Sequence, residues 1–242
     1  MIKQFRLISL PETIDAPLSR YTSFDRLSDL LENRSLYFRR ADLYKDSLEG
    51  TMSRSTLLQR PSFFEGATDH WIYETMPLID GQTRKCVYVN CWHNSESESL
   101  QMWENYTIKN KGVMIKSSLN KIRMSIIDTQ TEFLINPVQY INYEKGHISD
   151  TNSFYAFFHK DKSFEYEREV RFALIKNFKK IGTKNFDKLN LKKGILVLVN
   201  IDTLIEKIII SPYARDELVK KTSNLLKKYN LADKLESSSL KI

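Results

Sequence analysis

The sequence predicts an α+β fold, and two observations indicate it. Segments typical of strands and segments with helical spacing are interspersed along the chain, without the regular strand–helix–strand alternation of a parallel sheet. The chain also has no Gly-x-Gly-x-x-Gly turn and no Walker-type loop, which disfavours the parallel nucleotide-binding folds. Because no repeat, low-complexity tract or Gly/Ser linker divides the 242 residues, we expect one domain over residues 1–242.

The predicted elements follow from hydrophobic spacing and from residues that start or stop an element. In chain order they are a helix at 23–33, a strand at 35–39, a weakly helical stretch at 57–79, a strand at 86–92, a helix that begins near 95 and stops before 112, strands at 113–116, 133–143, 167–176, 194–201 and 207–211, and a helix at 214–229.

The two best-defined helices have capping signals. Ser23 is placed to cap the first, whose leucines at 27, 30 and 31 form one apolar stripe. Ser95 and Glu98 fit a capping box for the helix that follows them, and Gly112 is typical of a helix end. The strands are rich in β-branched and aromatic residues, and Pro137 fits a sheet edge or bulge within 133–143.

Charge and hydropathy restrict the class of partner. The formal net charge is +7 and the pI about 9.2, which favours an anionic partner such as nucleic acid. Apolar runs such as 195–199 fall far short of the roughly 18 residues of a membrane span. The first residues lack the long apolar stretch of a secretory signal, so we expect no such signal and a cytoplasmic protein with no membrane partner, in which Cys86 and Cys91 stay reduced.

The segment 164–175 is the strongest candidate for chemistry. In a strand, the period of two places Glu167, Glu169 and Arg171 on one face and apolar residues on the other. Two carboxylates about 7 Å apart on one face repel unless a cation or ligand compensates them. The alternative is a solvated strand face with an exposed ion pair, which contributes little.

Aromatic and basic residues elsewhere could form a ligand slot. Trp103 and Tyr106 share one helix face, where they either pack in the core or stack on a planar ring. Arg20 and Arg39 carry guanidinium groups that could bind a phosphate, or could simply be solvated. The four histidines and two cysteines show no ligand spacing for a metal, so we expect none.

A lysine-rich segment follows the candidate strand. Residues 176–193 contain seven Lys and one Asp, with Phe178 and Phe186 interleaved. Such a loop could bind single-stranded nucleic acid through Lys179, Lys180 and Lys184, or could serve solubility alone.

Taken in order, four segments resemble a family of bacterial proteins known only as a domain of unknown function. They are Arg20-Tyr21, Lys45-Asp46-Ser47-Leu48-Glu49, Met102-Trp103-Glu104-Asn105-Tyr106 with Gly112-Val113, and Tyr166-Glu167-Arg168-Glu169-Val170-Arg171. Lys45 and Ser47 depart from the Asn-Asp-Pro of the family's turn, which leaves its conformation open but keeps both acids, Asp46 and Glu49.

The resemblance implies a function. Members of the family are associated with antiphage defence and toxin–antitoxin systems, and the family looks like a remote relative of the ADP-ribosyltransferases, which use NAD as substrate and have a split, mainly antiparallel sheet with flanking helices. In that likeness Glu169 and Glu167 are catalytic. Arg20, Tyr21, Arg39, Trp103, Tyr106 and Arg171 would bind NAD. The Ser-Thr-Ser element of one transferase branch is missing, which implies the Tyr-using or a divergent branch.

The sequence therefore predicts a cytoplasmic transferase of the toxin or defence type that modifies a nucleic acid, RNA in preference to DNA or protein, and that could pair with an antitoxin protein. One rival is a metal-independent or metal-dependent nuclease that uses Glu167, Glu169 and a lysine, with Asp46 and Glu49 as further acids. The other is a non-catalytic nucleic-acid or protein-binding module.

Overall fold

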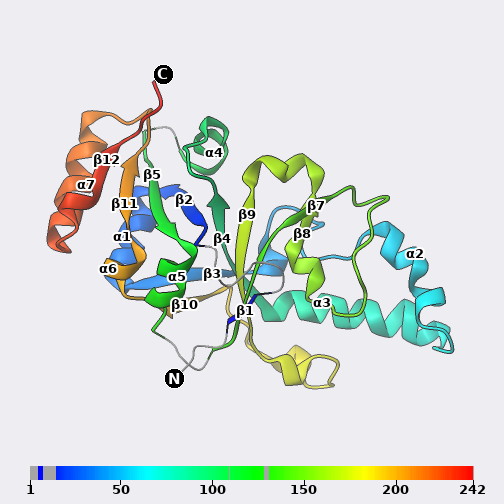
Figure 1. Cartoon of the computed structure of the whole chain (residues 1–242). Helices are drawn as coiled ribbons and strands as arrows, with labels where there is room; N and C mark the ends of the chain where they lie inside the picture. Colours follow the sequence, from blue (N-terminus) through cyan, green and yellow to red (C-terminus); the bar gives the residue numbers. More distant parts are fainter. Residues whose placement is uncertain (1–4, 8–14, 109, 128–130, 242) are drawn as a thin grey trace.

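The fold was analysed in a computed structural model, which describes residues 5–7, 15–108, 110–127 and 131–241. In this part of the chain, ten strands form one open, mainly antiparallel sheet with helices around it (Figure 1). The predicted α+β class is confirmed. The sheet order is β1 (Phe5–Leu7), β6 (Phe133–Pro137), β9 (Glu169–Ile175), β4 (Val87–Asn94), β2 (Pro17–Ser23), β5 (Gly112–Ser118), β11 (Lys207–Ile210) and β12 (Leu235–Ser237), with β3 (Ser35–Arg40) joining β4 to β10 (Gly194–Leu198).

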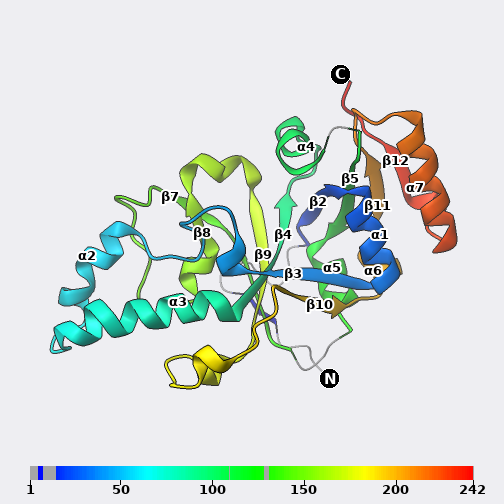
Figure 2. The same ribbon diagram turned by 180° about the vertical axis from the view of Figure 1, so that it is seen from behind.

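Helices lie on both sides of this sheet and at its ends. They are α1 (Phe24–Asn33), α2 (Arg54–Phe63), a π-helical turn (Trp71–Thr75) continued by α3 (Met76–Cys86), α4 (Leu100–Tyr106), α5 (Leu119–Ser125), α6 (Ile201–Leu204) and α7 (Asp216–Lys228). Both views show α2 and α3 extending from one end of the molecule, whereas α7 and β12 lie at the other (Figures 1 and 2). A pair of short parallel strands, β7 (Gln139–Ile141) and β8 (His159–Asp161), lies beside β9.

The sheet divides at β4, and this division positions the site. Tyr88 and Val89 of β4 pair with β3, whereas His93 and Asn94 pair with β2. β2 and β3 thus pair with opposite ends of the same edge of β4. In the stretch between the two pairings, the Asn90 side chain donates to the Tyr37 carbonyl of β3 at 2.9 Å. The other edge of β4 stays paired with β9 along its length.

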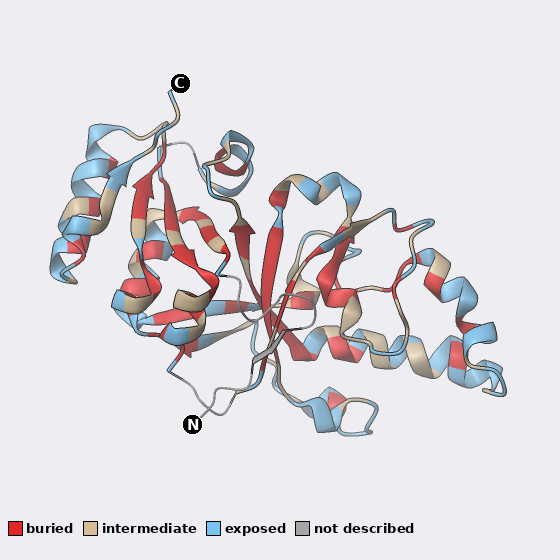
Figure 3. Ribbon diagram, in the orientation of Figure 1, coloured by how far each residue is buried: buried red, intermediate tan, exposed pale blue. Residues whose placement is uncertain are grey.

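The main core lies between the sheet and the helices on one face. Leu27, Leu30 and Leu31 of α1 are buried there, as their stripe predicts, against strand residues such as Phe38 and Phe172. Each fully buried side chain of this size contributes about 1.5–3 kcal/mol. Figure 3 shows the burial concentrated in the central strands. Ser23 caps α1 by accepting a hydrogen bond from the Arg26 amide at 3.4 Å, as the sequence predicts.

Several predicted boundaries are wrong, among them the following three. The strand predicted at 133–143 stops at Pro137 and β7 then pairs with β8 instead, because proline has no amide to continue a ladder. The helix predicted from Ser95 begins after Ser99, which accepts from the Met102 amide at 3.3 Å. The strand predicted from residue 167 begins at Glu169.

Candidate functional site

Glu169 and Arg171 of β9 form a buried ion pair. The Arg171 guanidinium contacts both oxygens of Glu169, with Nε at 2.6 Å from Oε1 and Nη2 at 3.0 Å from Oε2. Arg171 also donates to the Phe157 carbonyl at 2.6 Å and pairs with Glu49. All three charged side chains are buried. A guanidinium held on two sides in this way fixes the position of the Glu169 carboxylate.

Glu167 also lies beside this ion pair, but it belongs to a 3₁₀ helix and not to the predicted strand. It ends a 3₁₀ helix (Lys162–Glu167), and Arg168 then adopts the left-handed conformation at φ 41° before β9 starts. The prediction that Glu167 shares the strand with Glu169 is therefore wrong, because the chain turns between them. Glu167 nevertheless faces Glu169, and the ring of His93 contacts its carbonyl oxygen at 2.6 Å.

Lys160 links the two carboxylates. Its Nζ lies 2.5 Å from Oε2 of Glu167 and 3.7 Å from Oε2 of Glu169, and it lies over the Phe164 ring at 4.5 Å. The Tyr106 hydroxyl donates to Oε1 of Glu167. Lys160 carries no sequence signal that would select it, because it comes from β8, a strand of three residues with no hydrophobic alternation of its own.

The environment moves the pKa values of the two carboxyls in opposite directions. Burial would raise the pKa of Glu169, but the charge and hydrogen bonds of Arg171, with the charge of Lys160, hold it at about 2. Burial raises the pKa of Glu167, and the charge of Glu169 adds to this against the opposing charge of Lys160. Arg171 and Lys160 therefore hold Glu169 in its ionised form.

A cavity of about 720 Å³ opens in front of these carboxylates, where the sheet divides. Its walls come from β2, β3, β4, α1 and α4, together with Lys160 and the start of β9. Six residues that the sequence predicts for the site line it: Arg20, Tyr21, Arg39, Tyr106, Glu167 and Glu169. Its size is within the range of about 300–1,000 Å³ typical of small-molecule sites.

Besides the two carboxylates, three arginines line the cavity. The Arg20 guanidinium lies 6.0 Å from the centre of the Trp92 ring, and within the described chain its side chain has no hydrogen-bond acceptor. Burial lowers its pKa. Arg39 donates to the Leu43 carbonyl at 2.6 Å, and Arg26 lines the same cavity.

Two predicted NAD-binding residues lie outside the cavity. Trp103 is buried in a small apolar cluster, its indole Nε1 donating to Glu98 at 3.0 Å, so its prediction as a ring-stacking residue is wrong. The cause is the short helix α4, which directs Trp103 to the core and Tyr106 to the cavity. Arg171 lies behind Glu169 and does not line the cavity, so it orients that carboxylate rather than contacting a ligand. Tyr21 lines the cavity through its ring, and its hydroxyl accepts from the Ser99 amide at 2.8 Å.

The acids of the early turn have separate surroundings. Glu49 contacts Arg171, whereas Asp46 accepts from the Leu48 amide at 2.9 Å through one oxygen. Its other oxygen is buried without a partner in the described chain. Gly50 has a φ of 67°, and a Cβ there would lie 2.5 Å from the Phe157 ring, so only glycine suits this turn beneath Arg171.

The lysines predicted to bind nucleic acid lie on the surface. Lys179 and Lys180 belong to a short 3₁₀ turn (Phe178–Lys180), and Lys184 follows it; all three are exposed and do not line the cavity. Their assignment to nucleic-acid binding stays a prediction.

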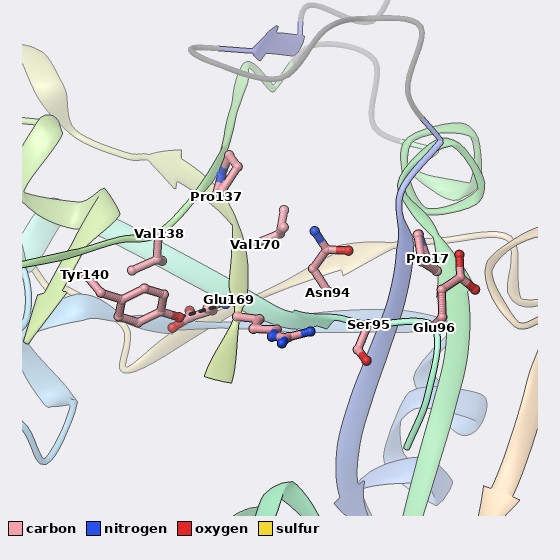
Figure 4. A pocket seen from close by; sticks show the side chains of 10 residues that line it. Pro17, Asn94, Ser95, Glu96, Pro137, Val138, Tyr140, Glu169 and Val170 are labelled. Carbon is pink, nitrogen blue, oxygen red and sulfur yellow. Dashed lines mark hydrogen bonds between the residues drawn. The ribbon is translucent and has the colours of Figure 1, made fainter. Parts of the chain in front are cut away.

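A second cavity, of about 530 Å³, also borders Glu169. Figure 4 shows Tyr140, Val138 and Pro137 on one side of it and Ser95 and Glu96 on the other. The Tyr140 hydroxyl accepts from the Glu169 amide at 2.8 Å, which fixes the start of β9.

No family model matches the chain, and no curated protein or solved structure matches it. In the part of the chain that the structure describes, no helix is long and apolar enough to cross a membrane. Within the same residues, no three side chains of His, Cys, Asp or Glu are grouped as metal ligands would be.

Proposed function

We propose that the protein is an NAD-dependent ADP-ribosyltransferase-like toxin or antiphage effector that modifies a nucleic acid. One observation carries the proposal: a single cavity has an ionised carboxylate, Glu169, and the arginines Arg20, Arg26 and Arg39 on its walls. NAD needs both kinds of group, because its pyrophosphate is anionic and its ribose becomes cationic during transfer.

Glu169 would stabilise the transition state. When the bond between nicotinamide and ribose breaks, the bonding electrons leave with nicotinamide and the ribose develops an oxocarbenium ion. A fixed carboxylate in a partly dry site stabilises that cation, as in glycosidases. Arg171 keeps Glu169 ionised and in place before the reaction starts, so little reorganisation is needed.

Glu167 and Tyr106 would act on the acceptor. A raised pKa suits a general base, since a more basic carboxylate removes a proton more effectively. The Tyr106 hydroxyl donates to this carboxylate, both side chains line the cavity, and the hydroxyl could orient the nucleophile. The acceptor loses its proton and forms a bond to the ribose carbon that nicotinamide has left.

One feature of the fold supports the transferase. The division of the sheet at β4 agrees with the split sheet that the resemblance implies.

Incubation of the purified protein with adenylate-labelled NAD and separate pools of RNA, DNA and lysate protein tests the proposal. We expect label in the RNA pool, and its loss in the Arg20→Ala variant at low NAD. Absence of label from every pool, with NAD intact, would contradict the proposal.

A further inference from the structure

We propose that Tyr37 is a stacking platform for a base of the acceptor, and hence that the acceptor is a single-stranded nucleic acid. The inference rests on the proposed function and names its second substrate. Tyr37 lies on β3 at the rim of the 720 Å³ cavity, and 44% of its surface is exposed. An aromatic ring exposed beside a reactive cavity can bind a planar group entering it.

The outer part of the Tyr37 ring packs over the backbone of the neighbouring strand. Tyr37 pairs with Leu196 of β10, and its ring crosses diagonally to Gly194. A Cβ at Gly194 would lie 2.1 Å from Cζ of Tyr37, so any other residue would displace the ring. Leu196 extends the apolar surface, being 56% exposed and also lining the cavity. The platform is thus ordered before a ligand arrives, which lowers the entropy cost of binding.

Cations surround this platform. Arg39 is directly opposite Gly194 in the strand pairing and is exposed on the same cavity wall. The exposed Lys192 and Lys193 immediately precede Gly194. Their backbone is fixed, because the Arg40 amide donates to the Lys193 carbonyl at 3.1 Å. In Figure 2 the loop that carries these lysines leads directly into β10 beside β3.

The combination identifies the chemistry of the occupant. A planar surface flanked by three cations suits a base followed by phosphates. The base must be unpaired, because bases within a duplex are already stacked on each other. A protein acceptor would gain from the apolar surface but would have no repeating anion to match the cations.

Binding is tested without NAD, by anisotropy of a fluorescein-labelled single strand of mixed sequence, about 12 nucleotides long. Tyr37→Ala should weaken binding about 5- to 100-fold, and Tyr37→Phe should retain it, because the ring alone stacks. In a salt series, Lys192→Ala/Lys193→Ala should reduce the log–log slope by about 1.4. The matched Lys227→Ala/Lys228→Ala pair on α7, with the same loss of charge, should leave the slope nearly unchanged.

Three results would overturn the inference: no binding of the single strand by the parent protein, equal binding by Tyr37→Ala, or equal slope changes for the two lysine pairs. A duplex of the same sequence that competes as well as the strand would also contradict it. The two proposals remain distinguishable. Strand binding without NAD cleavage refutes the transferase and leaves the platform as a nucleic-acid site. NAD cleavage without strand binding leaves the transferase and refutes the platform together with a single-stranded acceptor.

Discussion

Glu169 and Arg171, two residues apart on β9, determine the charge that faces the cavity. Together with Glu49, Glu167 and Lys160 they form a cluster of three carboxylates and two cations. Burial raises the pKa values of Glu49 and Glu167. Because three carboxylates face two cations, the cluster has one excess negative charge when fully ionised. A cation that develops in the cavity would reduce the repulsion between the carboxylates.

The pH dependence of stability tests the state of Glu169. Its pKa is about 2 in the folded chain against an ordinary value of 4.5. Between these values the unfolded chain binds more protons, so the free energy of unfolding rises with pH. We expect a contribution of order 3 kcal/mol that is complete above about pH 4.5 and is lost as the pH falls to about 2.

Urea unfolding of the parent and of Glu169→Gln between pH 2 and 7 measures this contribution. The difference in free energy between the two proteins should grow as the pH rises from 2 to 4.5 and then level off. Parallel curves across that interval would show that Glu169 is not held ionised by Arg171.

At the scale of elements, caps and hydrophobic spacing predict a helix or strand correctly where the residues that determine it lie within one segment of the chain. The cap at Ser23 and the stripe of leucines define α1, and both lie within eleven residues of each other in the chain. The turn between Glu167 and Glu169 has no such signal, since Arg168 adopts a left-handed conformation that is uncommon for arginine. The contacts of Lys160 and His93 hold it, and these come from other strands.

Glu98 connects α4 to the end of the chain. Its carboxylate accepts from the Trp103 indole and from Ser238 and Ser239, at 2.6–3.0 Å. We expect Glu98→Ala to lower the free energy of unfolding by about 1.5–3 kcal/mol, because hydrogen bonds to a charged group are lost. Hydrogen exchange at the Ser239 amide should become faster.

The exposed neighbour Glu96 supplies the control, since Glu96→Ala removes a carboxylate from the same loop. Both measurements should stay near their parent values in that variant. If exchange at Ser239 is unchanged in Glu98→Ala, the carboxylate does not hold the C-terminal segment against α4.

At the scale of the whole molecule, the site is assembled from segments far apart in the chain. Arg20, Tyr106, Lys160 and Glu169 come from β2, α4, β8 and β9. The sequence alone selected Arg20, Tyr106 and Glu169 as candidate site residues, from the chemistry of their side chains and their sequence context. The fourth, Lys160, becomes recognisable only when the fold places it between two carboxylates. The same tertiary packing directs Trp103 into the core, which its spacing from Tyr106 could not reveal.

The central claim is that Glu169 stabilises a ribosyl cation formed from NAD. Release of nicotinamide from NAD by the purified protein tests it most directly. Glu169→Gln should lower the rate about 100-fold or more, as removal of a transition-state stabiliser does. Glu165→Gln, which neutralises an exposed carboxylate in the preceding 3₁₀ helix, should react like the parent.

Arg20→Ala provides a second variant that does not depend on the stability of the buried ion pair. It should raise KM for NAD more than it lowers kcat, because Arg20 would bind the pyrophosphate rather than the reacting carbon. The account predicts nicotinamide release by the parent protein and its loss in Glu169→Gln with the fold intact by circular dichroism. No release by the parent, or equal release by a folded Glu169→Gln, would contradict it.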